Sequence, residues 1–158
     1  MDDKVRGATK NDLPRMIELA DQKRIEYEKY QPTFWRRANH ARVMQTALFE
    51  KLLQRENVIA LVHDSNAIVD GFVIATITPA PPVYDPGGAT CLIDDFTVTE
   101  NDLWQTAGRA LLREAIRIAK ERGAVQTVVV CGHLDEAKRA FLRSESLTIA
   151  SEWYVKNI

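Results

Sequence analysis

The sequence predicts one α/β domain of the α+β type, in which helices flank a central sheet, and three observations predict it. A strand-like run at 92–98 is followed by an amphipathic helix at 108–123. Two runs rich in β-branched residues, 58–62 and 68–77, lie on either side of a turn signal and predict a hairpin. The continuous apolar run at 125–130 is typical of a strand buried on both faces.

The stretch before the hairpin predicts a short strand and two helices. Val5–Ala8 predicts the first strand, and Thr9 followed by Asp12 resembles a capping box that opens the first helix. Apolar residues then recur at helical spacing until Pro32 interrupts the pattern. A second helix is predicted from about residue 37 to residue 54.

The stretch after the hairpin alternates strands and helices. Residues 79–88 are rich in proline and glycine, and they predict a loop because they are too few for a domain linker. The helix at 108–123 turns an apolar face to the core and a charged face to water. A last helix around Phe141 and a last strand at 148–155 complete the order β-α-α-β-β-β-α-β-α-β in a single domain, 1–158.

Composition argues against several classes of protein. The hydrophobic fraction of 46% is enough for a core, and a formal net charge of −1 gives no support for broad nucleic-acid binding. No apolar run approaches the roughly 20 residues that span a bilayer, and Met1–Lys4 does not begin a signal peptide. The two cysteines form no disulfide or metal framework. We therefore expect a cytoplasmic protein with no nucleic-acid partner, no membrane association and no metal.

Gly108 stands where a strand, a short turn and a helix meet. A glycine there lets a ligand approach the N–H groups of the helix N-terminus, which carry partial positive charge and favour phosphate. A phosphate-rich cofactor is therefore the first hypothesis.

Three segments resemble the GCN5-related N-acetyltransferase family in order and spacing. They are the opening Ala8–Pro14, the strand Ile93–Val98, which is similar to the I-E-D-L-Y-V strand of polyamine acetyltransferases, and Gly108–Leu112, which matches G-R-A-L-L in the family's acetyl-CoA motif. The resemblance covers nearly the whole chain. It implies an acyl-CoA N-acyltransferase-type fold with a mixed, mostly antiparallel twisted sheet. It also implies acetyl-CoA as co-substrate and a homodimer, because family members often pair.

The family motif R/Q-x-x-G-x-G/A is degenerate in this chain. In the register set by the helix it falls on 103–108, where Leu103 replaces the basic or amide residue and Thr106 replaces the middle glycine. A literal match at 105–110 would put Arg113 where a core leucine belongs, so the first register is preferred. The resemblance implies these cofactor-binding residues: Phe96, Thr97, Val98, Trp104, Gln105, Thr106, Ala107, Gly108, Arg109 and Asp135.

Basic side chains give a further set of candidates for the phosphates of coenzyme A. These are Arg109, Lys138, Arg139 and Arg143. The alternative, which we favour for most of them, is that they line solvated helix faces.

Acetyl transfer to an amine needs a group that takes the amine proton, and the resemblance points to Asp94. Asp94 aligns with the glutamate of the family strand, while Asp95 faces the other side of the strand if the pairing is regular. A hydrogen-bonded structural role for Asp94 is an equal alternative.

The tyrosine that often protonates the departing thiolate in the family is replaced by Leu142 in this chain, and Ser146 replaces a family glycine. Tyr154, on the predicted last strand, is a candidate substitute for that acid. His133 follows the buried strand and could relay a proton, although a strand-end histidine more often only caps or packs.

Aromatic residues gather near the first helix and its following loop. By the resemblance this region forms one wall of the acceptor pocket, so Tyr27, Tyr30 and Trp35 are candidate substrate-binding residues together with Asp94. The alternative is that these rings close a pair of helices on the core.

Together these features predict an N-acetyltransferase that moves an acetyl group from acetyl-CoA to a primary amine of a small molecule by direct attack in a ternary complex. The alternative is a non-catalytic member of the same fold, either an acyl-CoA-binding sensor or a partner-binding module. Leu142 and the degenerate motif favour that alternative.

Overall fold

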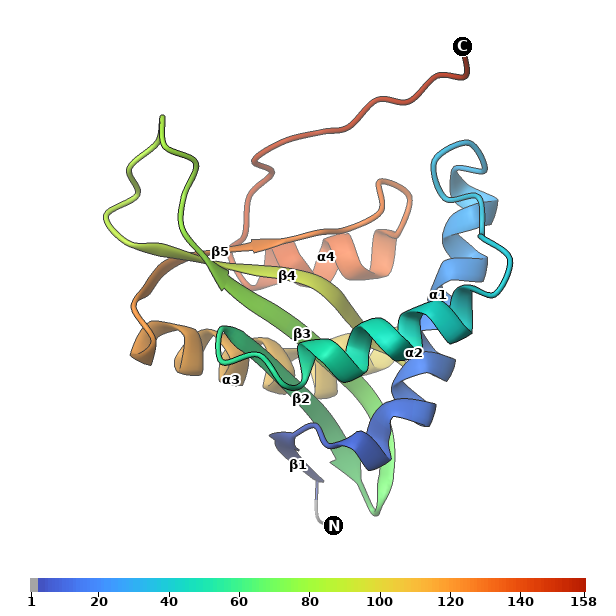
Figure 1. Cartoon of the computed structure of the whole chain (residues 1–158), viewed down its shortest axis with the longest axis horizontal. Helices are drawn as coiled ribbons and strands as arrows, with labels where there is room; N and C mark the ends of the chain where they lie inside the picture. The colour runs from blue at the N-terminus through green and yellow to red at the C-terminus, as the bar shows by residue number, and fades with distance from the viewer. Residues whose placement is uncertain (1–2) are drawn as a thin grey trace.

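A computed structural model describes residues 3–158 (Figure 1). These residues form a five-stranded sheet, four α-helices and two short 3₁₀ helices. In chain order the elements are β1 (Asp3–Gly7), η1 (Lys10–Asp12), α1 (Leu13–Tyr30), α2 (Ala41–Leu52), β2 (Val58–Ser65), β3 (Ile68–Thr78), β4 (Ala89–Val98), η2 (Asn101–Gln105), α3 (Ala107–Glu121), β5 (Ala124–Val129) and α4 (Glu136–Ser144).

The strands lie side by side in the order β1-β2-β3-β4-β5. All neighbours are antiparallel except β4 and β5, which are parallel because α3 carries the chain back across the sheet. The expected mixed, mostly antiparallel sheet is therefore confirmed.

Helices cover both faces of this sheet (Figure 1). α1 and α2 pack on one face through a cluster that includes Phe49 and Phe72. α3 and α4 pack on the other face through a cluster that includes Leu112, Phe141 and Val73. Successive side chains of a strand point to opposite faces, so the neighbours Phe72 and Val73 belong to different clusters.

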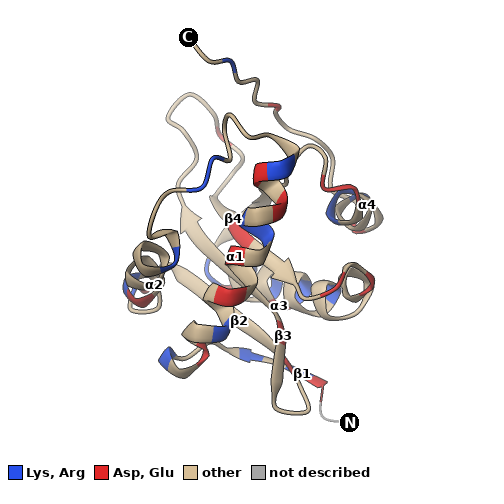
Figure 2. Ribbon diagram, turned by 90° about the vertical axis from the view of Figure 1, so that its right-hand side faces the viewer, with Lys and Arg blue, Asp and Glu red and all other residues tan. Residues whose placement is uncertain are grey.

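The first helix begins at the expected signal. The Asp12 carboxylate accepts the Thr9 N–H at 2.8 Å and pairs with Arg6, and the Arg6 hydrogen bond lowers the pKa of Asp12. Acidic and basic side chains both lie along α1, as Figure 2 shows. Among residues 3–158, no helix is both long enough and apolar enough to span a membrane.

The predicted last strand is not formed. Residues 147–158 have no helix or strand, and they run as an extended segment away from the body of the molecule (Figure 1). We name residues 148–158 the C-terminal tail. A strand needs a partner for its backbone groups, and no pairing joins the tail to the sheet within the described part of the chain.

Candidate functional site

The candidate site lies along β4, beyond the point where β5 leaves it. The two strands pair as far as Ile93 and Val129, and the Val130 N–H still donates to the Ile93 oxygen at 2.9 Å. From there to Val98, β4 has β3 as its only strand neighbour in the described chain. Residues from α1, α2, η2 and α4 surround this unpaired edge of β4.

A β-bulge separates the two adjacent acids of β4. Ile74 pairs with Asp95 while Ala75 pairs with Ile93, so Asp94 has no opposite residue on β3. The pairing is therefore irregular at Asp94, so the condition for placing Asp94 and Asp95 on opposite faces of the strand is not met. Asp94 is exposed and Asp95 is half-buried.

The carboxyl of Asp95 is held inside the protein. Burial, and then the charge of Asp94, raise its pKa to about 6, while Lys138 and Arg24 act in the opposite direction. Gln45 Nε2 of α2 donates to Asp95 at 3.4 Å, and Gln45 accepts a hydrogen bond from Arg24 of α1. A carboxyl with a pKa near 6 is well matched to accept a proton at neutral pH. The sequence favoured Asp94 as the group that takes the amine proton, but Asp95 is the carboxyl that is more buried and has the raised pKa.

Lys138 of α4 is only 4% exposed, and it lies against the unpaired edge of β4. Its Nζ donates to the Phe96 oxygen at 2.9 Å, and the Phe96 and Trp104 ring centroids are 5.4 and 5.6 Å away. Burial lowers the pKa of this ammonium, although Cys131 and Asp135 oppose that change. The interpretation of Lys138 as part of a solvated helix face is therefore wrong.

Lys138 and Leu142 lie one turn apart on the same side of α4. Leu142 is buried in the core cluster and offers no hydroxyl group. Ser146, where the family has glycine, follows α4 with a φ of 66°. The left-handed backbone that favours glycine at this position is therefore retained without it.

Tyr27 joins α1 to the loop after β5. Its hydroxyl donates to Asp135 at 2.7 Å and accepts the Gly132 N–H at 3.1 Å. A Cβ on Gly132 would lie 2.8 Å from the Tyr27 ring, so only glycine fits there. Burial, followed by the charge of Asp135, raises the pKa of the Tyr27 phenol. Asp135 also accepts the Lys138 backbone N–H at the start of α4. Its carboxylate therefore joins α1 to the first turn of α4.

Trp104 of η2 belongs to the core. It is 1% exposed, stacks on Phe141 and meets the Phe96 ring edge-on. A Cβ on Gly108 would lie 2.7 Å from Trp104 Cε3. Gly108 is therefore needed to seat this indole, a packing role that the ligand-approach hypothesis did not foresee. The indole face is covered by protein.

The N-terminus of α3 retains free donors. The first i to i−4 bond of the helix runs from the Ala110 N–H to the Thr106 oxygen. The amides of Ala107, Gly108 and Arg109 therefore have no acceptor within the helix. Thr106 is exposed at this end.

The Arg109 guanidinium is bonded to other side chains of the protein. Its guanidinium pairs with Glu145 at 2.7 Å and bonds the Gln105 side chain. Glu145 also pairs with Arg113 at 3.1 Å, and these bonds lower the pKa of Glu145 against the effect of its burial. Backbone amides, more than basic side chains, are thus the donors at this end of the site.

Two candidate proton carriers lie outside this arrangement. His133 is exposed, and its carbonyl accepts a bond from Arg139 at 2.9 Å. Tyr154 lies in the C-terminal tail, 89% exposed, and donates to Glu152 at 3.0 Å. Neither of these side chains makes a described polar contact with Asp95 or Lys138.

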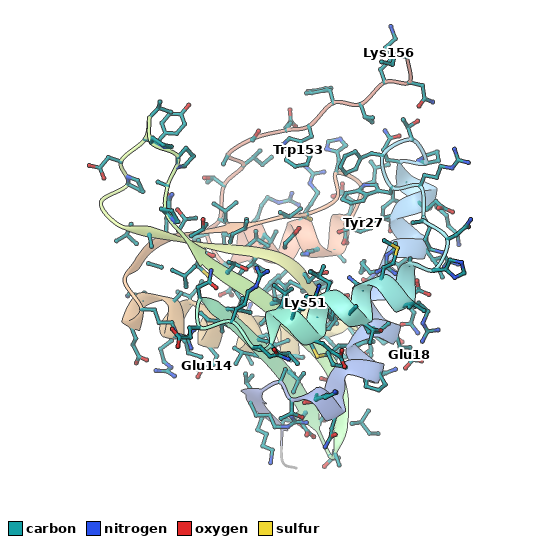
Figure 3. The ribbon with its side chains drawn as sticks, in the orientation of Figure 1. Glu18, Tyr27, Lys51, Glu114, Trp153 and Lys156 are labelled. Carbon is teal, nitrogen blue, oxygen red and sulfur yellow. The ribbon has the colours of Figure 1, made fainter. Side chains whose placement is uncertain are left out.

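The aromatic residues of α1 and its following loop contact one another. Tyr27 lies 5.7 Å from Tyr30 and 5.3 Å from Trp35 between ring centroids, and Phe34 meets both Trp35 and Trp153 edge-on. Figure 3 shows the Tyr27 and Trp153 side chains near the end of α1. The rings therefore form one group, which Trp153 of the tail joins.

A surface cavity of about 570 Å³ opens beside α1. It is lined by Asp21 and Glu28 of α1 and by residues 37–43. Asp21 pairs with Arg24 at 2.7 Å, and Arg24 reaches Gln45, the partner of Asp95. A chain of polar side chains therefore links the cavity to the site.

Comparisons with known proteins match no family model and no curated protein. Solved structures match over nearly the whole chain. A mutant of the BH1408 protein from Bacillus halodurans is 18% identical with a TM-score of 0.85, over 98% of this chain and 99% of that chain. A predicted acetyltransferase from Clostridium acetobutylicum, with acetyl-CoA, is 15% identical with a TM-score of 0.74, over 98% and 96%. The aminoglycoside N-acetyltransferase AAC(6')-Iy in complex with CoA is 12% identical with a TM-score of 0.74, over 99% and 94%.

The chain has the fold of the GCN5-related N-acetyltransferases. Two solved structures with this fold contain acetyl-CoA or CoA. At the α3 end, three amides have no acceptor within the helix, as a diphosphate at a helix N-terminus requires, and two of them belong to the buried residues Ala107 and Gly108. The indole N–H of Trp104 is buried in the core without an acceptor in the described chain, so it does not face this end of the site. At the other end, the Phe96 oxygen is already bonded to Lys138. A thioester lying along this edge of β4 would require the Lys138 side chain to move.

Sequence reasoning missed the residues whose role in the site is set by contacts with distant parts of the chain. Gln45 and Arg24 gave no motif, and the apolar surroundings of Lys138 come from β4 and η2, far away in the chain. One available signal was the i to i+4 spacing of Lys138 and Leu142, which places a cation on the buried side of an amphipathic helix.

Proposed function

We propose that the chain is an N-acetyltransferase that moves an acetyl group from acetyl-CoA to a primary amine of a small molecule. The observation that carries the proposal is the Asp95 carboxyl, half-buried at the bulge of β4 with a pKa raised to about 6. Support also comes from the fold, since its neighbours include an acetyltransferase with acetyl-CoA and an aminoglycoside N-acetyltransferase with CoA.

Asp95 serves as proton acceptor in this proposal. A primary amine is protonated at neutral pH, because its pKa is about 10, and it must lose a proton before it can attack. Above about pH 6 the Asp95 carboxylate is ionised and can take that proton, directly or through a water. Gln45, itself held by Arg24, orients the carboxylate. Acetyl-CoA, when bound, supplies the activated acyl group.

The cavity beside α1 suits the amine. Two carboxylates, Asp21 and Glu28, and two guanidiniums, Arg37 and Arg42, line it, so a polar amine meets groups of both signs there.

The test is a panel of primary amines incubated with acetyl-CoA, with release of free thiol as the readout. We expect turnover with at least one small amine. Asp95→Asn should lower kcat by about 100-fold or more, the usual range for a lost general base. Asp94→Asn is the matched control, since it removes a neighbouring exposed carboxylate, and it should retain kcat within about threefold. An equal loss of kcat in the two variants would contradict the role of Asp95 as proton acceptor.

A second candidate function, acyl-CoA binding without turnover, is favoured by the absence of a hydroxyl at Leu142. Calorimetry with acetyl-CoA separates the two. Binding with no turnover of any amine supports the second candidate. The absence of binding contradicts both.

A further inference from the structure

We propose that Lys138 is itself an acetyl acceptor: its Nζ takes the acetyl group of an acetyl-CoA bound along the unpaired edge of β4. The chain thereby modifies its own site, with no small amine involved. The inference rests on the proposed function in one respect, which is that acetyl-CoA binds along this edge.

Lys138 is a buried amine that lacks a charged partner. The side chain is 4% exposed, and none of the ion pairs found among residues 3–158 includes it. An ammonium has three N–H groups, and the only acceptor that the described chain gives them is the Phe96 oxygen, at 2.9 Å. The Phe96 and Trp104 rings flank Nζ, with centroids at 5.4 and 5.6 Å. Because an unpaired buried charge is costly, these surroundings suit a neutral amine.

A neutral amine is the form of lysine that attacks a thioester. Burial, the largest influence, lowers the pKa of Lys138, and the charge of Lys23 acts in the same direction. Cys131, Asp135 and Asp95 act the other way. Once neutral, Nζ can keep one N–H on its carbonyl acceptor while its lone pair is free, and lysines in apolar surroundings are activated as nucleophiles in this way.

The place of Nζ is the place where the thioester is expected. The Phe96 oxygen lies on β4 beyond the last pairing with β5, and the contact of the Phe96 ring with Trp104 links it to the turn before α3. A thioester along this edge displaces Nζ from that oxygen, but the Lys138 backbone stays fixed at the start of α4 by the Asp135 cap. The displaced amine therefore remains beside the acyl carbon, and binding brings the two reactants together.

The transfer balances without a further reactant. Nζ bonds to the carbonyl carbon of the thioester, and the bond from that carbon to sulfur breaks. The proton that Nζ loses passes to the departing sulfur, so the products are an acetyl-lysine amide and the free thiol of CoA. An amide is far less reactive than a thioester, so the acetyl group stays on Lys138 and each chain is modified once.

Mass spectrometry of the full chain tests this without any assay of transfer to an amine. The chain is incubated with acetyl-CoA alone and then digested for peptide mapping. We expect one acetyl group per chain, on Lys138, gained at least about tenfold faster than any on Lys156 of the C-terminal tail, because only the site holds its amine beside the thioester. In urea the two lysines should react alike. Acetyl groups spread evenly over both lysines in the folded chain would be chemical modification and would overturn the proposal.

The outcomes also separate this inference from the proposed function. Turnover of a small amine with Lys138 left unmodified overturns the inference alone. Modification of Lys138 without turnover of any amine supports the inference and contradicts the proposed function. Binding of acetyl-CoA in calorimetry with neither turnover nor modification contradicts both, and so does the absence of binding.

Variants of two nearby lysines make the assignment specific. Lys138→Arg keeps a cation at the site but has no amine, and it should lose the modification. Lys138→Met is a second variant, because a guanidinium is larger than the ammonium that it replaces, and it should lose the modification as well. Lys23→Arg is the matched control: Lys23 lies 3.8 Å from the Asp135 carboxylate, and this variant should be acetylated at Lys138 at the wild-type rate. An undiminished gain of the acetyl group in both Lys138 variants would overturn the proposal, since the acceptor would then lie elsewhere.

Discussion

The two ends of the unpaired β4 edge differ in what supplies their chemistry. At the α3 end the donors are backbone amides, and they remain although Leu103 and Thr106 have replaced motif residues. At the α4 end side chains supply the chemistry: Leu142 offers no hydroxyl, and the Lys138 ammonium is bonded to the Phe96 oxygen. Substitution of a side chain therefore leaves backbone donors in place, whereas it changes the groups present where side chains supply them.

The largest effect should come from the α3 end, with Gly108→Ala. The added Cβ would lie 2.7 Å from Trp104 Cε3 in the core, and overpacking of this kind costs about 1–3 kcal/mol of unfolding free energy. Urea unfolding measures the loss. Gly7→Ala is the control, because nothing lies within 4 Å of its added Cβ, and it should change stability by less than about 0.5 kcal/mol. Equal stability of the two variants would mean that Gly108 does not serve Trp104.

The next largest loss of stability should come from Tyr27→Phe, at the α4 end of the site. Removing the hydroxyl leaves the buried Gly132 N–H without its acceptor and takes a hydrogen bond from Asp135, at a cost of about 1–3 kcal/mol. Tyr30→Phe is the matched control on the same helix, since Tyr30 is exposed. Thermal or urea unfolding compares the two. A loss shared by both variants would point to a general effect on α1.

Lys138→Met tests whether the ammonium competes with a thioester for the edge of β4. Methionine cannot bond the Phe96 oxygen, so that oxygen becomes free, and acetyl-CoA should bind about tenfold more tightly, which corresponds to about 1.4 kcal/mol. Arg139→Met is the control, because Arg139 bonds Glu136 and the His133 carbonyl outside the site. Calorimetry gives both affinities. Weaker binding by Lys138→Met would show instead that the ammonium assists the ligand.

The sequence predicted most of the fold because local patterns dominate it. The helix at 108–123 and the hairpin at 58–77 rest on periodicity and turn residues, and the structure confirms both. The strand at 148–155 failed because a strand is defined by its neighbour, and alternation alone cannot supply one. The same limit applies to the site. The choice between Asp94 and Asp95 depends on a bulge against Ala75, which no pattern within 92–98 encodes.

The smallest effect should be on the stability of Asp95→Asn, whose pH dependence tests the raised pKa that the proposed mechanism uses. The pKa of Asp95 is about 6 in the folded state, above the value of about 3.9 for an unfolded chain. Between these two values the folded state binds more protons, so this carboxyl lowers stability as pH rises from about 4 to 6, and the deficit persists above that range. Asp95→Asn removes the deficit.

The variant should therefore be more stable than wild type at pH 8 by about 1 kcal/mol, a figure reduced for the partial exposure of the carboxyl, and equal to it near pH 3. Urea unfolding at the two pH values measures this, and Asp94→Asn should show a smaller gain, because it removes the charge that contributes after burial to the raised pKa of Asp95. A gain of the same size at both pH values would mean that the effect is one of packing and not of ionisation. If the gain in stability at pH 8 accompanies the loss of kcat, then the ionised Asp95 carboxylate lowers the stability of the fold while it supports catalysis.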